Sequence, residues 1–356
     1  MSGFLTPELR DLTPYVPGEQ PQGKDYVKLN TNESPFPPSP LVLEALSRAE
    51  TARLNLYSDP TALALRRAIA AQYGVKAENV FTGNGSDEVL GFAFLAFLGA
   101  RRPVTLPDVS YGFYQVLARL FHIPINRVAV NEDLSLPAER FSGVNTMVAF
   151  ANPNAPTGIA LPLDDVERIV AGNPRHVVLV DEAYVDFGGK SALPLTKTYP
   201  NLLVVRTFSK SRSLAGARLG YAMGNEALIC DLDRVRNSFH PYNINRLSML
   251  AGIEAMRDQA YFAACTDEII RQREETAREL RALGFSMTGS AANFLFVRHP
   301  RLSGGEYYEK LKARGVLVRH WSEPRIEAYV RITIGTREQM RRLVLETRGI
   351  LLEVGA

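Results

Sequence analysis

Lys210 is the side chain in this sequence whose type and surroundings most clearly suggest chemistry. It follows Ser209 and comes shortly after the apolar run 202–205, which is typical of a buried strand, and Arg218 lies eight residues further on. An amine at the end of a strand, close to hydroxyls and a guanidinium, can condense with an aldehyde while its neighbours bind a phosphate. The spacing therefore predicts Schiff-base chemistry on a phosphate-bearing aldehyde.

Asp181 is a second candidate, because it ends a similar run. The apolar residues 177–180 lead directly into Asp181 and Glu182. If the two strands are neighbours, the Asp181 carboxylate and the Lys210 amine face one cleft, and a buried carboxylate needs a cationic partner. The protonated nitrogen of a pyridine ring would be such a partner. The alternative is that Asp181 caps the following helix or pairs with a nearby arginine.

Gly85 and Ser86 lie in the segment 83–88 (GNGSDE), which precedes a strongly apolar helical stretch over 89–98. Glycine permits close backbone approach, and the free amides at the start of a helix can bind a phosphate. The Ser209 hydroxyl and the Arg218 guanidinium could contribute to the same phosphate. The alternatives are an ordinary capped helix, in which Asp87 and Glu88 complement the helix dipole, and a surface arginine.

Two further segments follow predicted strands. Residues 152–158 (NPNAPTG) predict a rigid turn whose side-chain amides could bind a ligand oxygen, although a plain turn has the same composition. Tyr111 follows the run 103–106, where its ring could stack on a planar cofactor or could simply belong to the core.

Composition favours a protein that acts on small molecules. The 41 basic and 38 acidic side chains are interspersed, so no basic stripe for nucleic acid is expected. Cys230 and Cys265 lack metal-ligand spacing and are too few for a disulfide framework, which favours a reducing, cytoplasmic location without a metal. No secretion signal is recognisable, and no apolar stretch approaches the ~20 residues of a membrane span, so no membrane association is expected.

Three segments are expected along the 356 residues. Residues 1–40 are rich in proline and asparagine and predict an extended arm, which would pack with the smaller of two domains, at 41–255 and 256–356. In the larger domain, apolar runs alternate with helical stretches, which predicts an α/β fold with a mostly parallel central sheet covered by helices. Ligands then gather at the carboxyl ends of the strands. The four predicted strands are 103–106, 144–149, 177–180 and 202–205.

The last part of the chain predicts a small α/β domain. A charged helix over 261–283, ended by Gly284, leads into it. Arg319 and Arg331 each interrupt an apolar strand, where an unpaired guanidinium would be costly, so both are candidate anion ligands. The alternative is the polar face of an alternating strand. The predicted elements are strands at 293–297, 316–319 and 329–334 and helices at 305–314 and 337–353.

Taken in order, the segments 83–88, 154–158, 181–184, 209–210 and 214–220 resemble the fold-type I pyridoxal-phosphate aminotransferases. Within that group, residues 29–35, 57–60, 241–243 and 329–336 are most similar to the histidinol-phosphate aminotransferases. The resemblance covers nearly the whole chain. It implies a large domain that binds pyridoxal 5'-phosphate, a small C-terminal domain and an extended N-terminal arm.

The resemblance also implies roles for individual residues. Lys210 would bind the cofactor covalently, Asp181 would pair with its pyridine nitrogen, and Tyr184 would bond its phenolic oxygen, while Tyr111 would stack on the ring. Tyr57 would reach the cofactor of a neighbouring subunit, so that a homodimer shares its active sites. The remaining implied cofactor ligands, which would bind the phosphate, are Gly85, Ser86, Thr207, Ser209 and Arg218.

The implied reaction is transfer of an amino group from histidinol phosphate to 2-oxoglutarate, giving glutamate, in histidine biosynthesis. Arg319 and Arg331 would bind the anionic group of the substrate, and Tyr15 and Asn32 of the arm would close over it. Alternative substrates are an aromatic amino acid or another phosphorylated amine, and an alternative reaction is decarboxylation of a phosphorylated amino acid such as threonine phosphate. A nucleotide-binding module is disfavoured, because no phosphate-loop motif with its lysine follows a strand.

The sequence departs from the pattern of the family at one position. Ala155 stands directly before Pro-Thr-Gly, where the family usually has the asparagine that bonds the ring oxygen. A lost hydrogen bond of this kind costs ~1 kcal/mol. Tyr184 could keep the site working, and Asn154 or Asn152 could compensate, so Asn154 is included among the candidate cofactor ligands.

Overall fold

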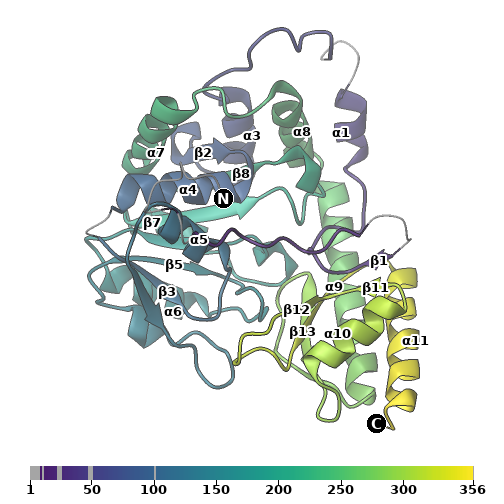
Figure 1. The fold of residues 1–356 in the computed structure, drawn as a ribbon. Coiled ribbons are helices and arrows are strands. Elements are labelled where there is room, and N and C mark those ends of the chain that lie inside the picture. Colours follow the sequence, from purple (N-terminus) through teal and green to yellow (C-terminus); the bar gives the residue numbers. More distant parts are fainter. Residues whose placement is uncertain (1–8, 10–11, 22–25, 47–50, 100–101, 356) are drawn as a thin grey trace.

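The computed structural model describes residues 9, 12–21, 26–46, 51–99 and 102–355. Parts of the predicted arm, at residues 1–8, 10–11 and 22–25, lie outside these ranges. A seven-stranded sheet forms the larger part of the molecule, and smaller sheets lie beside it (Figure 1). The strand order of the large sheet is β2 (Val80–Gly83), β8 (Gly220–Gly224), β7 (Leu202–Thr207), β6 (Val178–Asp181), β5 (Met147–Ala151), β3 (Val104–Pro107) and β4 (Ile125–Val128).

The large sheet is mostly parallel, as the sequence predicts. Its strands β7, β6, β5, β3 and β4 run in one direction, and β8 is antiparallel to both β7 and β2. All residues of β2, β3, β5, β6, β7 and β8 are buried, which explains why the predicted runs show no polar alternation. The four predicted strands are confirmed within a few residues, whereas β2, β4 and β8 were not among them.

Helices cover both faces of this sheet. On one face, α4 (Gly85–Phe97), α5 (Phe113–Leu120) and α7 (Glu226–Phe239) pack on a core that contains Leu179 and Leu203. On the other, α6 (Leu163–Gly172) packs on Val178 and Val204, and α3 (Leu63–Tyr73) and α8 (Arg246–Arg257) pack on β2 and β8. Side chains at odd-numbered positions of β6 and β7 thus pack into the core on one face of the sheet, and those at even-numbered positions pack into the core on the other face. The α/β fold predicted from the sequence is confirmed.

A four-stranded antiparallel sheet forms the smaller part of the molecule. Its order is β12 (Arg319–His320), β13 (Val330–Thr333), β10 (Phe294–Arg298) and β9 (Ser286–Met287). The helices α9 (Gln259–Ala282), α10 (Gly304–Ala313) and α11 (Arg337–Glu353) pack around one core with it, and all three lie within a few residues of their predicted positions. The predicted domain boundary at residue 255 stays a prediction.

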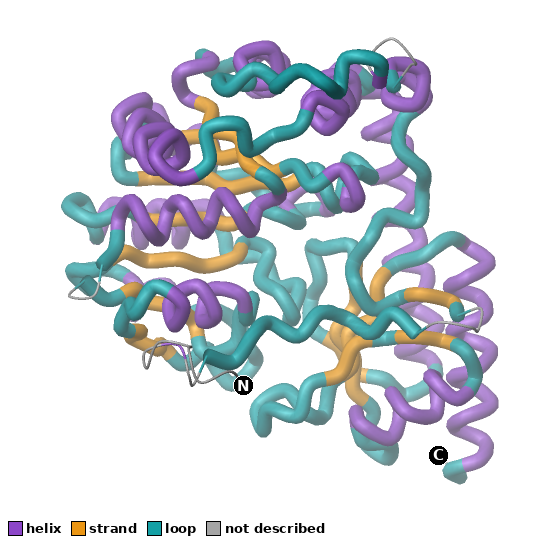
Figure 2. The backbone as a smooth tube through the Cα atoms, turned by 45° about the horizontal axis from the view of Figure 1, so that its top comes forward, coloured by secondary structure: helices purple, strands orange, loops and turns teal. Residues whose placement is uncertain are grey.

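The arm connects the two parts (Figure 2). Within it, β1 (Val27–Lys28) pairs in parallel with β11 (Val316–Leu317), and α1 (Pro40–Ala45) follows. The predicted strand 316–319 is therefore two short strands, because β11 pairs with the arm and β12 pairs with β13. Nearer the N-terminus, the Tyr15 ring packs edge-on against Tyr111 and Phe113, at the carboxyl edge of the large sheet. The arm therefore crosses the space between the two sheets.

In the part of the chain that the structure describes, no helix combines the length and apolar character needed to cross a membrane. Over the same residues, no cluster of three or more His, Cys, Asp or Glu side chains is arranged to hold a metal ion.

Candidate active site

Lys210 and Asp181 are brought together by the strand order. Asp181 is the last residue of β6, and β6 pairs in parallel with β7, whose carboxyl end leads to Lys210. The expectation that their two strands are neighbours is confirmed. The Lys210 Nζ donates a hydrogen bond to the carbonyl oxygen of Thr31 in the arm, at 3.0 Å. Burial, with the nearby Arg331 charge, lowers the pKa of Lys210 from 10.5 to about 8.

Asp181 is buried without a cationic partner among the described residues. Its Oδ2 accepts a hydrogen bond from the Tyr114 hydroxyl at 2.9 Å, and its Oδ1 accepts one from the Ala183 amide at 3.1 Å. Burial raises the pKa of Asp181 from 3.8 to about 6. The adjacent Glu182 instead pairs with Arg206, with Nη2 to Oε2 at 2.8 Å. The arginine pairing considered for Asp181 is thus made by its neighbour, and the Asp181 carboxylate stays available for a ligand cation.

Tyr184 is joined to the arm. Its hydroxyl accepts a hydrogen bond from Asn32 Nδ2 at 2.9 Å, and burial raises its pKa. Asn32 has a positive φ of 53°, and its backbone N–H donates to Thr333 Oγ1 of β13 at 3.0 Å, while that hydroxyl donates to Asn32 Oδ1 at 2.9 Å. Asn32 therefore connects the arm, the small sheet and Tyr184.

The candidate phosphate ligands come together at one place in the large sheet. Gly220 of β8 pairs with Gly83 on one side and with Thr207 on the other, so the segments that follow β2 and β7 lie next to the start of β8. The packing is close: a Cβ on Gly220 would come within 2.3 Å of the Ser86 amide nitrogen. The Thr207 hydroxyl donates to Ser209 Oγ at 3.0 Å.

Arg218 completes this group. A Cβ on Gly85 would come within 2.5 Å of Arg218 Nη2, so the guanidinium lies directly over the start of α4. Arg218 also pairs with Asp87, with Nη2 to Oδ2 at 3.2 Å, and remains about half exposed. Ser86 lies inside α4, and no side chain caps that helix at Asn84, so the structure does not support a capping role for Ser86.

Tyr111 lies between the arm and the Asp181 site. Its hydroxyl donates to Asp87 Oδ1 at 2.9 Å, and its ring packs edge-on against Tyr114 with the centroids 5.6 Å apart. Since Tyr114 bonds Asp181, the Tyr111 ring borders the same space as the carboxylate.

Arg319 and Arg331 lie directly opposite one another on β12 and β13. Arg319 donates to the arm carbonyls of Pro17 at 3.0 Å and Val16 at 2.9 Å, and Arg331 donates to that of Asn30 at 3.1 Å. Within the described part of the chain, neither arginine pairs with a carboxylate. Burial lowers the pKa of Arg331, and its Nε is buried without a hydrogen-bond partner. Arg331 thus differs from the solvated polar face considered as its alternative.

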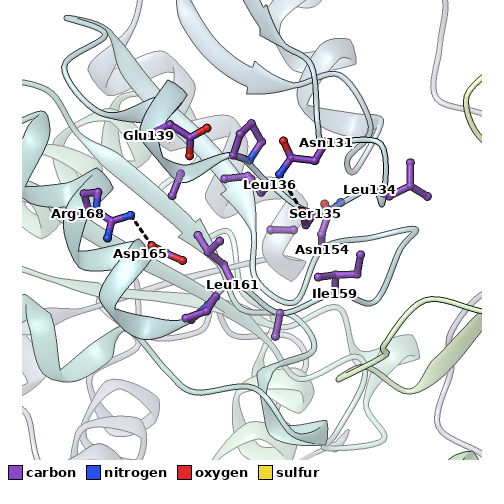
Figure 3. Close-up of a pocket in the computed structure, with 15 residues that line it drawn as sticks. Asn131, Leu134, Ser135, Leu136, Glu139, Asn154, Ile159, Leu161, Asp165 and Arg168 are labelled. Atoms are coloured by element: carbon purple, nitrogen blue, oxygen red, sulfur yellow. Dashed lines mark hydrogen bonds and ion pairs between the residues drawn. The ribbon is translucent and has the colours of Figure 1, made fainter.

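Within the described residues, no hydrogen bond or ring contact joins Asn154 or Tyr57 to the residues above. The Asn154 amide group donates to the Val109 carbonyl and Thr157, and its oxygen accepts from Ser110. It lines a separate cavity of about 340 Å³, shown in Figure 3, which Arg168 also lines. Compensation for Ala155 by Asn154 therefore stays a prediction. Tyr57 is 80% exposed, and its ring stacks on Tyr242.

Several contact residues were not anticipated from the sequence. Tyr114 bonds Asp181, Thr333 fixes Asn32, and Trp321 lies against both Arg319 and Arg331. Trp321 is the only tryptophan in the chain, which is the one signal that could have drawn notice to it.

Comparison with known proteins agrees with this geometry. A family model described as aminotransferase class I and II matches residues 24–345. The chain is 49% identical over 355 residues to the histidinol-phosphate aminotransferase of Aromatoleum aromaticum, covering 99% of this chain and 100% of the relative. It is also 49% identical to the histidinol-phosphate aminotransferase of Chromohalobacter salexigens, over 97% of this chain and 98% of the relative.

Solved structures of aminotransferases have the same fold as this chain. The histidinol-phosphate aminotransferase of Sinorhizobium meliloti in complex with pyridoxal-5'-phosphate has a TM-score of 0.86 at 26% identity, covering 97% of this chain and 96% of that one. Fold and site thus define a protein of the fold-type I aminotransferase class. The chain belongs to the aminotransferase class I and II family.

Proposed function

We propose that this protein transfers the amino group of histidinol phosphate to 2-oxoglutarate, giving imidazole acetol phosphate and glutamate, with pyridoxal 5'-phosphate bound at Lys210. Relatives that are 49% identical over nearly the whole chain carry the name histidinol-phosphate aminotransferase. The observation that carries the proposal is the grouping of the Lys210 amine, whose pKa is lowered, with a buried carboxylate and two arginines that form no ion pair within the described residues. In the cell the reaction would serve histidine biosynthesis.

The residues present fit pyridoxal phosphate. Asp181 is a buried acid whose described neighbours supply two hydrogen bonds but no positive charge, so a protonated pyridine nitrogen would complete its environment. The start of α4 lies under Arg218, close to the hydroxyls of Thr207 and Ser209, which is a donor set suited to a phosphate. Lys210 supplies the amine for covalent attachment.

Each side chain then has a defined task. When bound, the cofactor supplies an aldehyde for the amine and a conjugated ring that accepts electrons. Asp181 would hold the proton on the ring nitrogen, and Tyr184, positioned by Asn32, would bond the ring oxygen. Lys210 would move a proton at the α-carbon of the substrate, because an amine whose pKa is about 8 is a usable base near neutral pH. The arm would exclude water over the substrate.

The proposal includes a homodimer that shares its active sites. The motif resemblance assigns Tyr57 to the partner's cofactor, and its exposed ring, stacked on Tyr242 beside the exposed Leu54 and Leu56, is available for such a contact. Sedimentation at the protein concentration used for assays would measure the subunit number. The cytoplasmic location stays a prediction from cysteine usage.

A half-reaction tests the proposed function. Protein loaded with pyridoxal phosphate is mixed with histidinol phosphate alone, and absorbance follows the conversion of the bound cofactor to its aminated form. Adding 2-oxoglutarate should reverse the conversion and release glutamate. Conversion by an aromatic amino acid but not by histidinol phosphate would identify the alternative substrate, and carbon dioxide released from threonine phosphate would identify a decarboxylase.

Arg331→Ala should impair phosphorylated substrates selectively. Truncating a charge that contacts a charged ligand costs about 2–5 kcal/mol, so we expect kcat/KM for histidinol phosphate to fall by roughly 30-fold or more. The loss for histidinol, which lacks the phosphate, should be much smaller. Steady-state kinetics on both amines measures this, with Arg341→Ala, an exposed arginine of α11, as the control. Equal losses for the two amines would show that Arg331 does not bind the phosphate.

The lowered pKa of Lys210 predicts how attachment of the cofactor depends on pH. Only the neutral amine attacks an aldehyde, and the folded-state pKa of about 8 lies below the ordinary 10.5. The initial rate of covalent capture of pyridoxal phosphate by the apoprotein should therefore rise with pH up to about 8 and level off above it. Stopped-flow absorbance over this range gives the profile. A rate that keeps rising toward pH 10 would mean that the Lys210 pKa is not lowered.

A further inference from the structure

The two substrate arginines occupy an unusual place for like charges. Arg319 and Arg331 are cross-strand partners in the register of β12 and β13. Like charges directly opposite one another on a sheet repel and destabilise the pairing. In the described ranges no carboxylate forms an ion pair with either of them. The nearby acid Glu19 is paired with Lys312, with Oε2 to Nζ at 2.6 Å. The arm carbonyls of Val16, Pro17 and Asn30 accept hydrogen bonds from the two guanidinium groups, but these neutral oxygens leave the repulsion between the two charges only partly offset.

The Trp321 ring is in contact with both guanidinium groups. The guanidinium carbon of Arg331 lies 5.1 Å from the Trp321 ring centroid, and that of Arg319 lies 5.5 Å from it. A guanidinium at this distance from an indole is stabilised by the negative face of the ring, with contributions from about 0.5 kcal/mol at exposed sites to about 2 kcal/mol when desolvated. One ring thus contacts both charges.

The ring is itself held by aromatic side chains of the small sheet. Phe296 lies opposite Arg331 in the register of β10 and β13, and its ring packs edge-on against Trp321 at 6.4 Å between centroids. Phe296 in turn stacks on Tyr329 at 4.5 Å. The Phe294 ring is also in contact with Arg331, with the guanidinium carbon 5.3 Å from the ring centroid. Trp321 therefore belongs to a group of aromatic rings in which Phe294 and Trp321 contact Arg331 and Phe296 packs against Trp321.

We propose that Trp321 is a positioning residue that holds Arg319 and Arg331 side by side as a two-guanidinium site for the phosphate group of the amine substrate. This inference rests on the proposed function, because it assigns the phosphate of that substrate to this site. A carboxylate in the place of Trp321 would hold the two arginines equally well, but it would neutralise them and compete with the phosphate. The indole face lowers their repulsion and leaves their positive charge for the ligand.

Kinetics with two variants tests the role. Trp321→Leu removes the ring and keeps an apolar side chain, and Trp321→Phe restores a smaller ring. We expect Trp321→Leu to raise KM for histidinol phosphate by about 10-fold, with a smaller effect on kcat and on histidinol, because the contact concerns the phosphate. Trp321→Phe should recover most of the loss. Equal increases of KM for both amines, or no recovery with phenylalanine, would overturn the proposal.

The same ring provides a second measurement that does not depend on turnover. Because Trp321 is the only tryptophan, its fluorescence reports on this site alone. Inorganic phosphate should change the emission saturably, chloride at equal ionic strength should not, and Arg331→Ala should abolish the response. Phosphate that inhibits turnover competitively without changing the emission would overturn the proposal. If the unaltered protein does not use histidinol phosphate, the proposed function fails, while the phosphate titration still decides the role of Trp321.

Discussion

Lys210→Ala is expected to abolish amino transfer while leaving the protein folded. The substitution removes the amine that would attach the cofactor and move the proton at the substrate α-carbon, and loss of a nucleophile and base together should lower kcat by at least about 10⁴-fold. The fold should survive, because the amine makes one described hydrogen bond, to the Thr31 carbonyl, and its burial as a cation is unfavourable. Turnover assays and circular dichroism measure the two effects.

Chemical trapping locates the attachment directly. Reduction of the loaded protein with borohydride, followed by peptide mapping, should place the cofactor on residue 210. Lys197→Ala, at an exposed lysine, is the matched control and should keep both the label and the activity. A label on another lysine, or undiminished turnover of Lys210→Ala, would contradict the assignment.

Asp181→Asn is expected to have the second-largest effect. Asparagine keeps the shape of the side chain and can still accept the hydrogen bond from either Tyr114 or the Ala183 amide, but it removes the charge that would hold a proton on the ring nitrogen. Removing one preorganised electrostatic contact of this kind typically costs about 10²–10³ in kcat. The measurement is the rate of the half-reaction at saturating histidinol phosphate, with the exposed Asp267→Asn as the control.

The stability of the apoprotein, unlike its activity, should change little in Asp181→Asn. The pKa of Asp181 is raised from 3.8 to about 6 in the fold, so the folded apoprotein binds this proton more tightly than the unfolded chain does. The corresponding stabilisation is complete below pH 3.8 and is lost as the pH rises through about 6. At pH 7.5 the removal of an unfavourable buried charge should offset the one hydrogen bond that asparagine cannot accept, so the apoprotein of Asp181→Asn should unfold at a urea concentration close to that of the unaltered protein. Strong destabilisation, with activity lost in proportion to unfolded protein, would show that Asp181 acts mainly on the fold.

Much of the fold could be predicted because buried strands and half-buried helices have recognisable patterns of apolar residues in the sequence. Strands buried on both faces, such as β6 and β7, appear as short runs of apolar residues, and the amphipathic α9 ends where Gly284 stops it. The strand β8 escaped prediction because its sequence, Gly220–Gly224, carries a glycine at each end and little aliphatic bulk. Its antiparallel direction depends on pairing with β2 and β7, which no local pattern encodes.

The candidate site was predictable to the extent that its residues follow strands. Lys210 and Asp181 each come just after an apolar run, and parallel strands deliver such residues to one edge. The contacts that connect distant segments were not predictable. Arg319 donates to Pro17, 302 positions earlier, and Trp321, which follows β12, contacts Arg331 on the neighbouring strand β13. Such contacts depend on how the sheets and the arm are arranged in space.

The arm has a consequence for how substrate preference can change in this protein. Residues 12–21 form no helix or strand, yet Tyr15 packs against Tyr111 and Phe113 beside the large sheet, and the carbonyls of Val16 and Pro17 accept hydrogen bonds from Arg319 of the small sheet. Tyr15 and Val16 are exposed, so this stretch contributes little to the hydrophobic interior. We therefore expect exchanges of this stretch between relatives to retune which amines are admitted while leaving folding and the chemical step to the rest of the chain.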